Sequence, residues 1–146
     1  MWKDKNVHKH QMRTIDKVIV HCSATREGQD IDAATIDTWH KDRGWSGIGY
    51  HYVIKLDGTI EYGRMVDKMG AHCKGHNKNS IGICYIGGCD EYMNPKDTRT
   101  SSQKTSLFAL LLFLKRLHKE SVIHGHRDFS NKACPSFDAT KEYKNI

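Results

Sequence analysis

The segment 124–138, HGHRDFSNKACPSFD, brings together side chains that bind metal ions. They are the imidazoles of His124 and His126 and the thiol of Cys134. His21, which ends an apolar run near the start of the chain, is the candidate for a further donor. Zinc held by one early histidine, one late histidine and Cys134 would have three protein donors and one open position. This is the arrangement of a catalytic zinc site rather than a structural one.

The residues alone leave two alternatives open. His124 and His126 point the same way in an extended segment, so periodicity does not choose between them. The spacing from His126 to Cys134 is a weak pattern. A buried, hydrogen-bonded histidine and a buried thiol are common in protein cores, so His21 and Cys134 could equally be core residues.

Length and composition indicate one globular domain. The chain has 146 residues, of which 38% are hydrophobic and 27% charged, enough for a single core and without a compositional sign of long disorder. The longest apolar run, LFALLLFL at 107–114, is too short to cross a membrane, so no membrane insertion is expected. A monomer is the default expectation.

The formal net charge of +6 predicts an anionic partner. Nucleic acid is not favoured, because the basic residues are scattered and no nucleic-acid-binding motif is found. A carboxylate-rich polymer such as the bacterial cell wall fits the same charge. The N-terminus lacks the apolar core of a secretory signal, and five cysteines make no even disulfide framework. We therefore expect synthesis in a reducing cytoplasm without a signal peptide, and action on the wall after release or export.

The elements that must position these residues alternate between strands and helices. Strands are predicted at 17–22, 50–55, 59–62, 80–87 and 121–124, and helices at 32–43, at 101–118 and from 137 onward. The turn Asp57-Gly58 predicts a hairpin, so the sheet is mixed rather than all parallel. The expected fold is α/β, a single domain with a mixed central β-sheet flanked by helices. Residues 1–15 are predicted to form a flexible arm and residues 16–146 the domain.

Smaller predictions concern the two long helices. Asp30 or Asp32 would cap the first, and Gly44 would end it. Ile36 and Trp39 are predicted to face the sheet, and His40 to be a surface or capping histidine near the helix end. The second helix starts with the capping-box spacing of TSSQ at 100–103.

Longer motifs resemble those of the type 2 N-acetylmuramoyl-L-alanine amidases, a zinc-dependent family that shares its fold with the peptidoglycan recognition proteins. The motifs are VHCSAT at 20–25, WHKDRGW at 39–45, GYHYVIKLDGT at 49–59, GAHCKGHNKNSIGIC at 70–84 and KACPSFD at 132–138. They follow the family's order over nearly everything after the first fifteen residues. In particular, the sequence resembles the small phage lysozymes of this family.

The resemblance implies a role for each candidate residue. The zinc ligands would be His21, His126 and Cys134, with His126 selected over His124 by its distance from the KAC motif. Tyr50 and Lys132 would be catalytic, and His72 would contact substrate at the edge of the cleft. The implied reaction is hydrolysis of the amide between N-acetylmuramic acid and L-alanine in bacterial peptidoglycan, as in a phage endolysin.

The chemistry of this reaction suits these residue types. Zinc can activate water and polarise the carbonyl of an unreactive amide, and the Lys132 cation can stabilise the developing oxyanion. Tyr50 can hydrogen-bond the water or the intermediate, but its ordinary pKa near 10 makes it a poor base. No motif places an acidic residue as the general base.

Two other functions are weighed against the enzyme. Some relatives are non-catalytic peptidoglycan-binding modules, and in them loss of the cysteine ligand accompanies loss of activity. Cys134 is present here, which favours the enzyme. A phage relative also regulates an RNA polymerase through its N-terminal region. Residues 1–15 match that region poorly, so this partner is disfavoured.

Overall fold

The computed structural model describes residues 13–146, whose main sheet has five strands in the order β4-β3-β5-β1-β7. The strands are β1 (Lys17–Cys22), β3 (Tyr52–Ile54), β4 (Ile60–Tyr62), β5 (Ser80–Tyr85) and β7 (Val122–Gly125). β1 is parallel to β5 and β7, and β3 is parallel to β5, whereas β4 runs antiparallel to β3. The predicted mixed sheet and its hairpin are confirmed.

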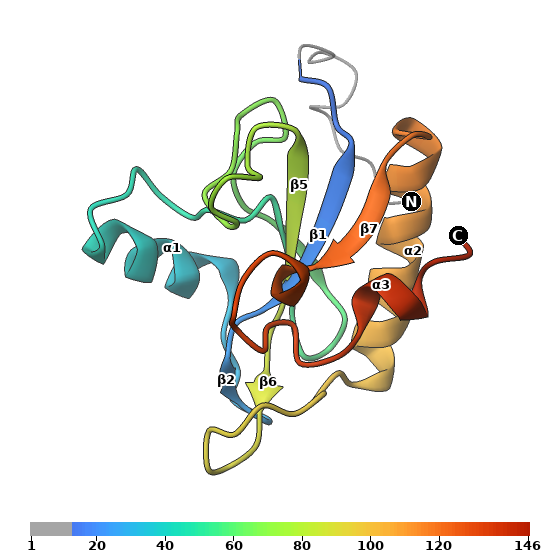
Figure 1. Cartoon of the computed structure of the whole chain (residues 1–146). Coiled ribbons are helices and arrows are strands. Elements are labelled where there is room, and N and C mark those ends of the chain that lie inside the picture. The colour runs from blue at the N-terminus through green and yellow to red at the C-terminus, as the bar shows by residue number, and fades with distance from the viewer. Residues whose placement is uncertain (1–12) are drawn as a thin grey trace.

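Two helices lie on opposite faces of this sheet (Figure 1). α2 (Ser101–Leu117) buries its leucine stripe in a core with alternate residues of β1, such as Val18 and Val20. α1 (Ala33–Asp42) places Ile36 in a smaller cluster with residues of β3 and β5. Because side chains alternate along a strand, His21 points to the side of the sheet that α1 covers. No residue of β1 belongs to the smaller cluster on that side. This leaves room at the carboxyl end of β1 for a site.

The helix ends follow from their capping residues. The Asp32 carboxylate accepts a hydrogen bond from the Thr35 backbone N–H at 2.9 Å, and Gly44 follows α1 with a φ of +88°, a value that favours glycine. At α2, the Thr100 hydroxyl and the Gln103 side chain each accept from the other residue's backbone N–H. The predicted caps are confirmed.

A second, two-stranded sheet pairs β2 (Thr25–Arg26) with β6 (Gly88–Cys89) in parallel. β2 falls in a segment that was predicted to be loop, and β6 lies just beyond the strand predicted at 80–87, at residues for which no element was predicted. A short 3-10 turn, η1 (His126–Asp128), follows β7, and α3 (Ala139–Glu142) comes near the end of the chain. Tyr50 lies just before β3 rather than within a strand beginning at residue 50.

Trp39 is a correction to the sequence prediction. Its side chain is 37% exposed, whereas Ile36 is 1% exposed. The α1-side cluster draws its sheet residues from β3 and β5, so this helix covers part of the sheet and only one of the two predicted side chains packs beneath it.

Most of the predicted arm, residues 1–12, lies outside the described residues. Residues 13–15 pack on the domain: Ile15 is buried in the α2-side core, and the Arg13 guanidinium donates to the carbonyls of Val66, Lys78 and Ser80. The folded domain therefore includes these three residues of the predicted arm. In the described part of the chain, no helix has the length and apolar character needed to cross a membrane.

Candidate metal and active site

Three donor atoms meet at the carboxyl ends of strands β1 and β7. His21, His126 and Cys134 each offer an atom within 4.8 Å of the other two. His21 is 1% exposed near the carboxyl end of β1, and His126 opens the 3-10 turn directly after β7. Since β1 and β7 are parallel neighbours, their carboxyl ends lie together, and the loop towards α3 brings Cys134 beside them.

The spacing of these donors fits a zinc ion. The Nδ1 of His21 lies 3.8 Å from the Sγ of Cys134, and the rings of His21 and His126 are 4.6 Å apart between centroids. Tetrahedral zinc, with Zn–N about 2.0–2.1 Å and Zn–S about 2.3 Å, would place nitrogen and sulfur donors about 3.6 Å apart. His124 is not in this group: its Nδ1 faces the Asp128 carboxylate at 3.6 Å. The structure brings together the set selected by the motifs.

Electrostatics keep both imidazoles in the form that binds metals. Burial, followed by the charges of His72 and His126, lowers the pKa of His21 well below its usual value. Burial and Lys132 lower the pKa of His126. A neutral imidazole has a free nitrogen lone pair at neutral pH and is the ligating species.

Cys134 is held beside these rings by the backbone of β1. The backbone N–H of Cys22 donates to its Sγ at 3.3 Å. A hydrogen bond with the Cys22 thiol, together with burial, raises the pKa of Cys134. A coordinated cation reverses this effect, because a metal-bound thiol is deprotonated.

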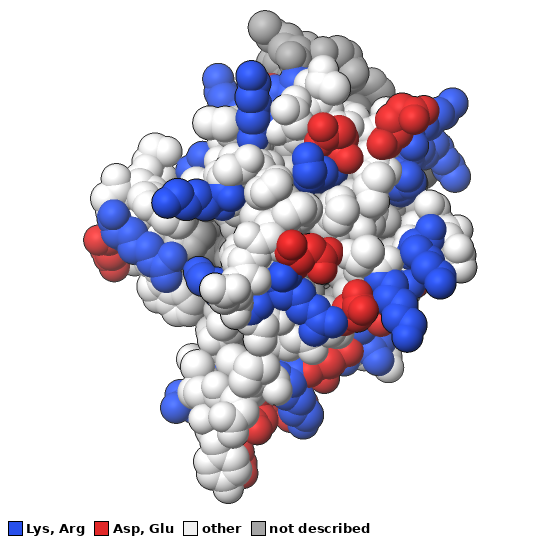
Figure 2. Space-filling model, viewed as in Figure 1, with Lys and Arg blue, Asp and Glu red and all other residues white. Residues whose placement is uncertain are grey.

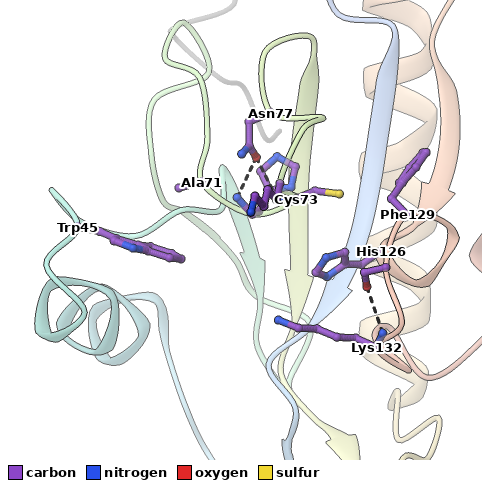
Figure 3. A pocket seen from close by; sticks show the side chains of 10 residues that line it. Trp45, Ala71, Cys73, Asn77, His126, Phe129 and Lys132 are labelled. Carbon is purple, nitrogen blue, oxygen red and sulfur yellow. Dashed lines mark hydrogen bonds between the residues drawn. The ribbon is translucent and has the colours of Figure 1, made fainter.

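Two of the three donors, His126 and Cys134, line a cleft with two adjoining parts, and His21 is buried behind them. The larger part, about 570 Å³, is lined by Trp45, Phe129 and Lys74 among others, and the smaller part, about 190 Å³, reaches Tyr50 and Cys134. Both parts share the side chains of Trp45, His72, His126 and Lys132. Figure 3 shows Trp45 on one wall, facing His126 and Lys132 on the other. Among the described residues, neither Asp nor Glu lines either part.

Tyr50 lies between two histidines at the inner end of the cleft. Its ring centroid is 5.0 Å from that of His21 and 5.6 Å from that of His40. Burial, with the nearby thiols Cys84 and Cys134, raises the pKa of Tyr50 well above its usual value. A raised pKa favours the protonated hydroxyl, which can donate a hydrogen bond into the cleft.

His40 was predicted to be a surface or capping histidine near the helix end, and the surface alternative is wrong. It is 6% exposed, its Nδ1 accepts a hydrogen bond from the Gly49 backbone N–H at 2.9 Å, and its ring lies 4.6 Å from that of Trp45. Burial and nearby Arg43 and Arg64 lower the pKa of His40 to about 4. The neutral ring fixes the turn that presents Tyr50. The signal in the sequence was its spacing of four from buried Ile36, one turn along the same helix face.

His72 is also brought to the site. It is 8% exposed and lines both parts of the cleft. Its Nδ1 lies 2.8 Å from the Nε2 of His21, and its Nε2 lies 3.2 Å from the Ser80 hydroxyl. Substrate contact by His72 stays a prediction, and with both nitrogens engaged it would involve the carbon edge of the ring.

Comparison with known proteins decides the family. A family model described as N-acetylmuramoyl-L-alanine amidase matches residues 11–137. The chain belongs to this amidase family. The amidase is 43% identical over 128 residues to the endolysin of Escherichia phage T7, an alignment that covers 88% of this chain and 85% of that protein.

Two solved structures show where the amidase fold recurs. N-acetylmuramoyl-L-alanine amidase LysC from Clostridium intestinale URNW superposes with a TM-score of 0.77 at 32% identity, covering 89% of this chain and 82% of LysC. The bumblebee peptidoglycan recognition protein SA superposes with a TM-score of 0.74 at 28% identity, covering 90% and 81%. The predicted family, enzyme class and fold are confirmed.

Proposed function

We propose that this amidase is zinc-dependent and hydrolyses the amide bond between N-acetylmuramic acid and L-alanine in bacterial peptidoglycan, as an endolysin does. The observation that supports this proposal most directly is the group formed by His21, His126 and Cys134, whose donor atoms lie within 4.8 Å of one another beside an open cleft. A peptidoglycan-binding module would not need this donor set.

The donor set supports an open rather than a closed metal site. Two nitrogens and one sulfur are three protein ligands, as in catalytic zinc centres, whereas structural sites have four. Bound zinc would act there as a Lewis acid and lower the pKa of water.

Lys132 and Tyr50 would act on the charge that develops at the scissile carbonyl. The Lys132 ammonium, on the cleft wall next to His126, would stabilise negative charge on the carbonyl oxygen. The Tyr50 hydroxyl, whose protonated form is favoured by its buried surroundings, would donate a hydrogen bond to the same oxygen.

The shape and charge of the cleft suit a wall polymer. The larger part is open and carries Lys74 and Lys132, while Trp45 and Phe129 add aromatic surface on its walls. Stem-peptide carboxylates would meet cations there, and the aromatic side chains could pack on apolar substrate faces. Figure 2 shows basic side chains spread over one face with acidic ones among them, so the local lining of the cleft selects the substrate more than a general field does.

The test is peptide release from purified peptidoglycan by the zinc-loaded protein, measured as newly formed alanine amino groups. His126→Ala should lose both bound zinc and turnover. His124→Ala is the matched control, because it removes the other imidazole of the same segment, which faces Asp128 instead, and it should keep both.

Two results would contradict the proposal. One is a zinc-loaded parent protein that binds cell walls but releases no peptide, which would indicate a binding module. The other is a His126→Ala variant that is as active as the parent, which would exclude this residue from the reaction.

A further inference from the structure

We propose that His72 is a positioning residue that holds the ring of His21 so that its Nδ1 is presented to the metal. This inference rests on the proposed zinc-dependent function and goes beyond it, because His72 would act through a ligand rather than on the substrate.

The two ring nitrogens of His21 face different partners. Its Nδ1 lies 3.8 Å from the Cys134 sulfur, on the side where the donor atoms converge. Its Nε2 lies 2.8 Å from the Nδ1 of His72. When Nδ1 gives its lone pair to a metal, the neutral ring carries its proton on Nε2, and that N–H donates to His72. Histidine ligands generally fix their tautomer and orientation through such an outer hydrogen bond.

The other nitrogen of the His72 ring extends this chain of hydrogen bonds to Ser80. If its Nδ1 accepts from His21, its own proton is on Nε2, which lies 3.2 Å from the buried hydroxyl of Ser80. Each neutral imidazole then has one donor and one acceptor satisfied. The arrangement accounts for two buried rings in direct contact without requiring charge on either.

The backbone holds the His72 ring in a tight slot. The backbone N–H of His72 donates to the Asn77 side-chain oxygen at 2.9 Å. A Cβ built on Gly70 or Gly82 would lie 2.6 Å from a ring atom of His72, so both positions need glycine for the ring to fit between them. An acceptor confined in this way can hold His21 with little rotational freedom.

The test compares His72→Leu with His72→Asn. The two replacement side chains have the same branched shape, but only Asn offers an oxygen near the position of the histidine Nδ1. The readout is the zinc dissociation constant of the folded, metal-free protein, from competition with a chromophoric chelator. His72→Leu should weaken zinc binding about 10- to 100-fold, the usual effect of losing an outer hydrogen bond to a ligand. His72→Asn should restore most of the affinity.

A spectroscopic measurement reports the hydrogen bond itself. In the zinc-loaded parent, nitrogen-15 NMR should show the His21 Nε2–H as a slowly exchanging proton. The signal should persist in His72→Asn and broaden or vanish in His72→Leu.

His51→Leu is the control for loosening of the same region. His51 is as buried as His21, and its nitrogens bond Gly82 N–H and the Lys68 carbonyl. This variant should melt at a lower temperature without metal but keep the zinc affinity of the parent.

The outcomes separate the two proposals. If the parent binds zinc and cleaves its substrate but His72→Leu binds zinc as tightly, the positioning role is overturned and the function stands. If His72→Asn loses as much affinity as His72→Leu, the acceptor is not what matters and the role is again overturned. If the parent binds no zinc, the proposed function fails, and this inference with it.

Discussion

Arg99 ties the segment before α2 to α3 and thereby to the loop that carries Cys134. Its side chain is 2% exposed. It donates to the carboxylates of Asp97 and Glu142 at 2.8–2.9 Å and to the Tyr143 hydroxyl at 2.9 Å. Its guanidinium carbon lies 3.4 Å from the centroid of the Phe137 ring. The substitution Arg99→Met removes every one of these polar contacts while keeping an apolar stem.

The expected cost follows from how buried each partner is. Removing one member of a fully buried ion pair costs roughly 3–5 kcal/mol. The side chains of Asp97 and Glu142 are 33% and 44% exposed, so water takes over part of the lost interaction, and we expect a loss of about 2–3 kcal/mol in the free energy of unfolding. Lys96→Met breaks the Lys96–Glu27 pair, in which both side chains are 50% exposed, and should change the free energy of unfolding little, because water screens an exposed ion pair.

The assay is urea unfolding of the metal-free proteins in the presence of chelator, at pH 7 and at pH 3. The hydrogen bond from Arg99 lowers the pKa of Glu142. A lowered pKa in the folded state adds stability above the unfolded pKa, about 4.3 for glutamate, and that stability is lost as the pH falls through the folded value. The difference in the free energy of unfolding between the parent and Arg99→Met should therefore become smaller on acidification. A difference in unfolding free energy under about 0.5 kcal/mol at pH 7 would refute this account. A difference that is the same at pH 3 as at pH 7 would also refute it.

Three further predictions concern activity and stability. Lys132→Met should lower kcat about 10²- to 10³-fold, as loss of an oxyanion-stabilising group does, and should leave the zinc dissociation constant unchanged. Lys132→Arg should recover part of the rate. Equal rates for the parent and both variants would contradict this prediction. Tyr50→Phe should lower kcat about 10²-fold with zinc content preserved, and a full-rate variant would remove the hydroxyl from the mechanism. Gln103→Met should lower the free energy of unfolding by about 2 kcal/mol in urea, because the Ile54 and Ile86 carbonyls lose their side-chain donor; full zinc affinity is expected, and parent-like stability would be the contrary result.

Local chemistry made several elements predictable from the sequence. The β-branched run at 17–22 is β1 with the same bounds, because a strand buried on both faces is apolar throughout. The caps at Asp32, Thr100 and Gln103 were recognisable because capping depends on residues within one helical turn.

Features that depend on distant segments were not accessible to periodicity. The choice of His126 over His124 came from motif resemblance, and in three dimensions it depends on where the chain turns after β7. The burial of His40 depends on an acceptor role towards Gly49, in the next segment. The contact between His21 and His72 joins residues 51 positions apart and left no local signature.

The position of β1 between β5 and β7 has a consequence for how the protein is made. Its neighbour β7 begins at Val122, and the sulfur that faces His21 belongs to a residue 113 positions later. Such distant pairings slow folding, since a long stretch of backbone must be closed before the contacts form. On the ribosome, β1 can pair with β5 only after Tyr85 has been made, and with β7 only after Gly125. A fragment terminated ahead of Cys134 would lack one of the three proposed zinc ligands, so under the proposed function the site could form only when the chain is nearly complete.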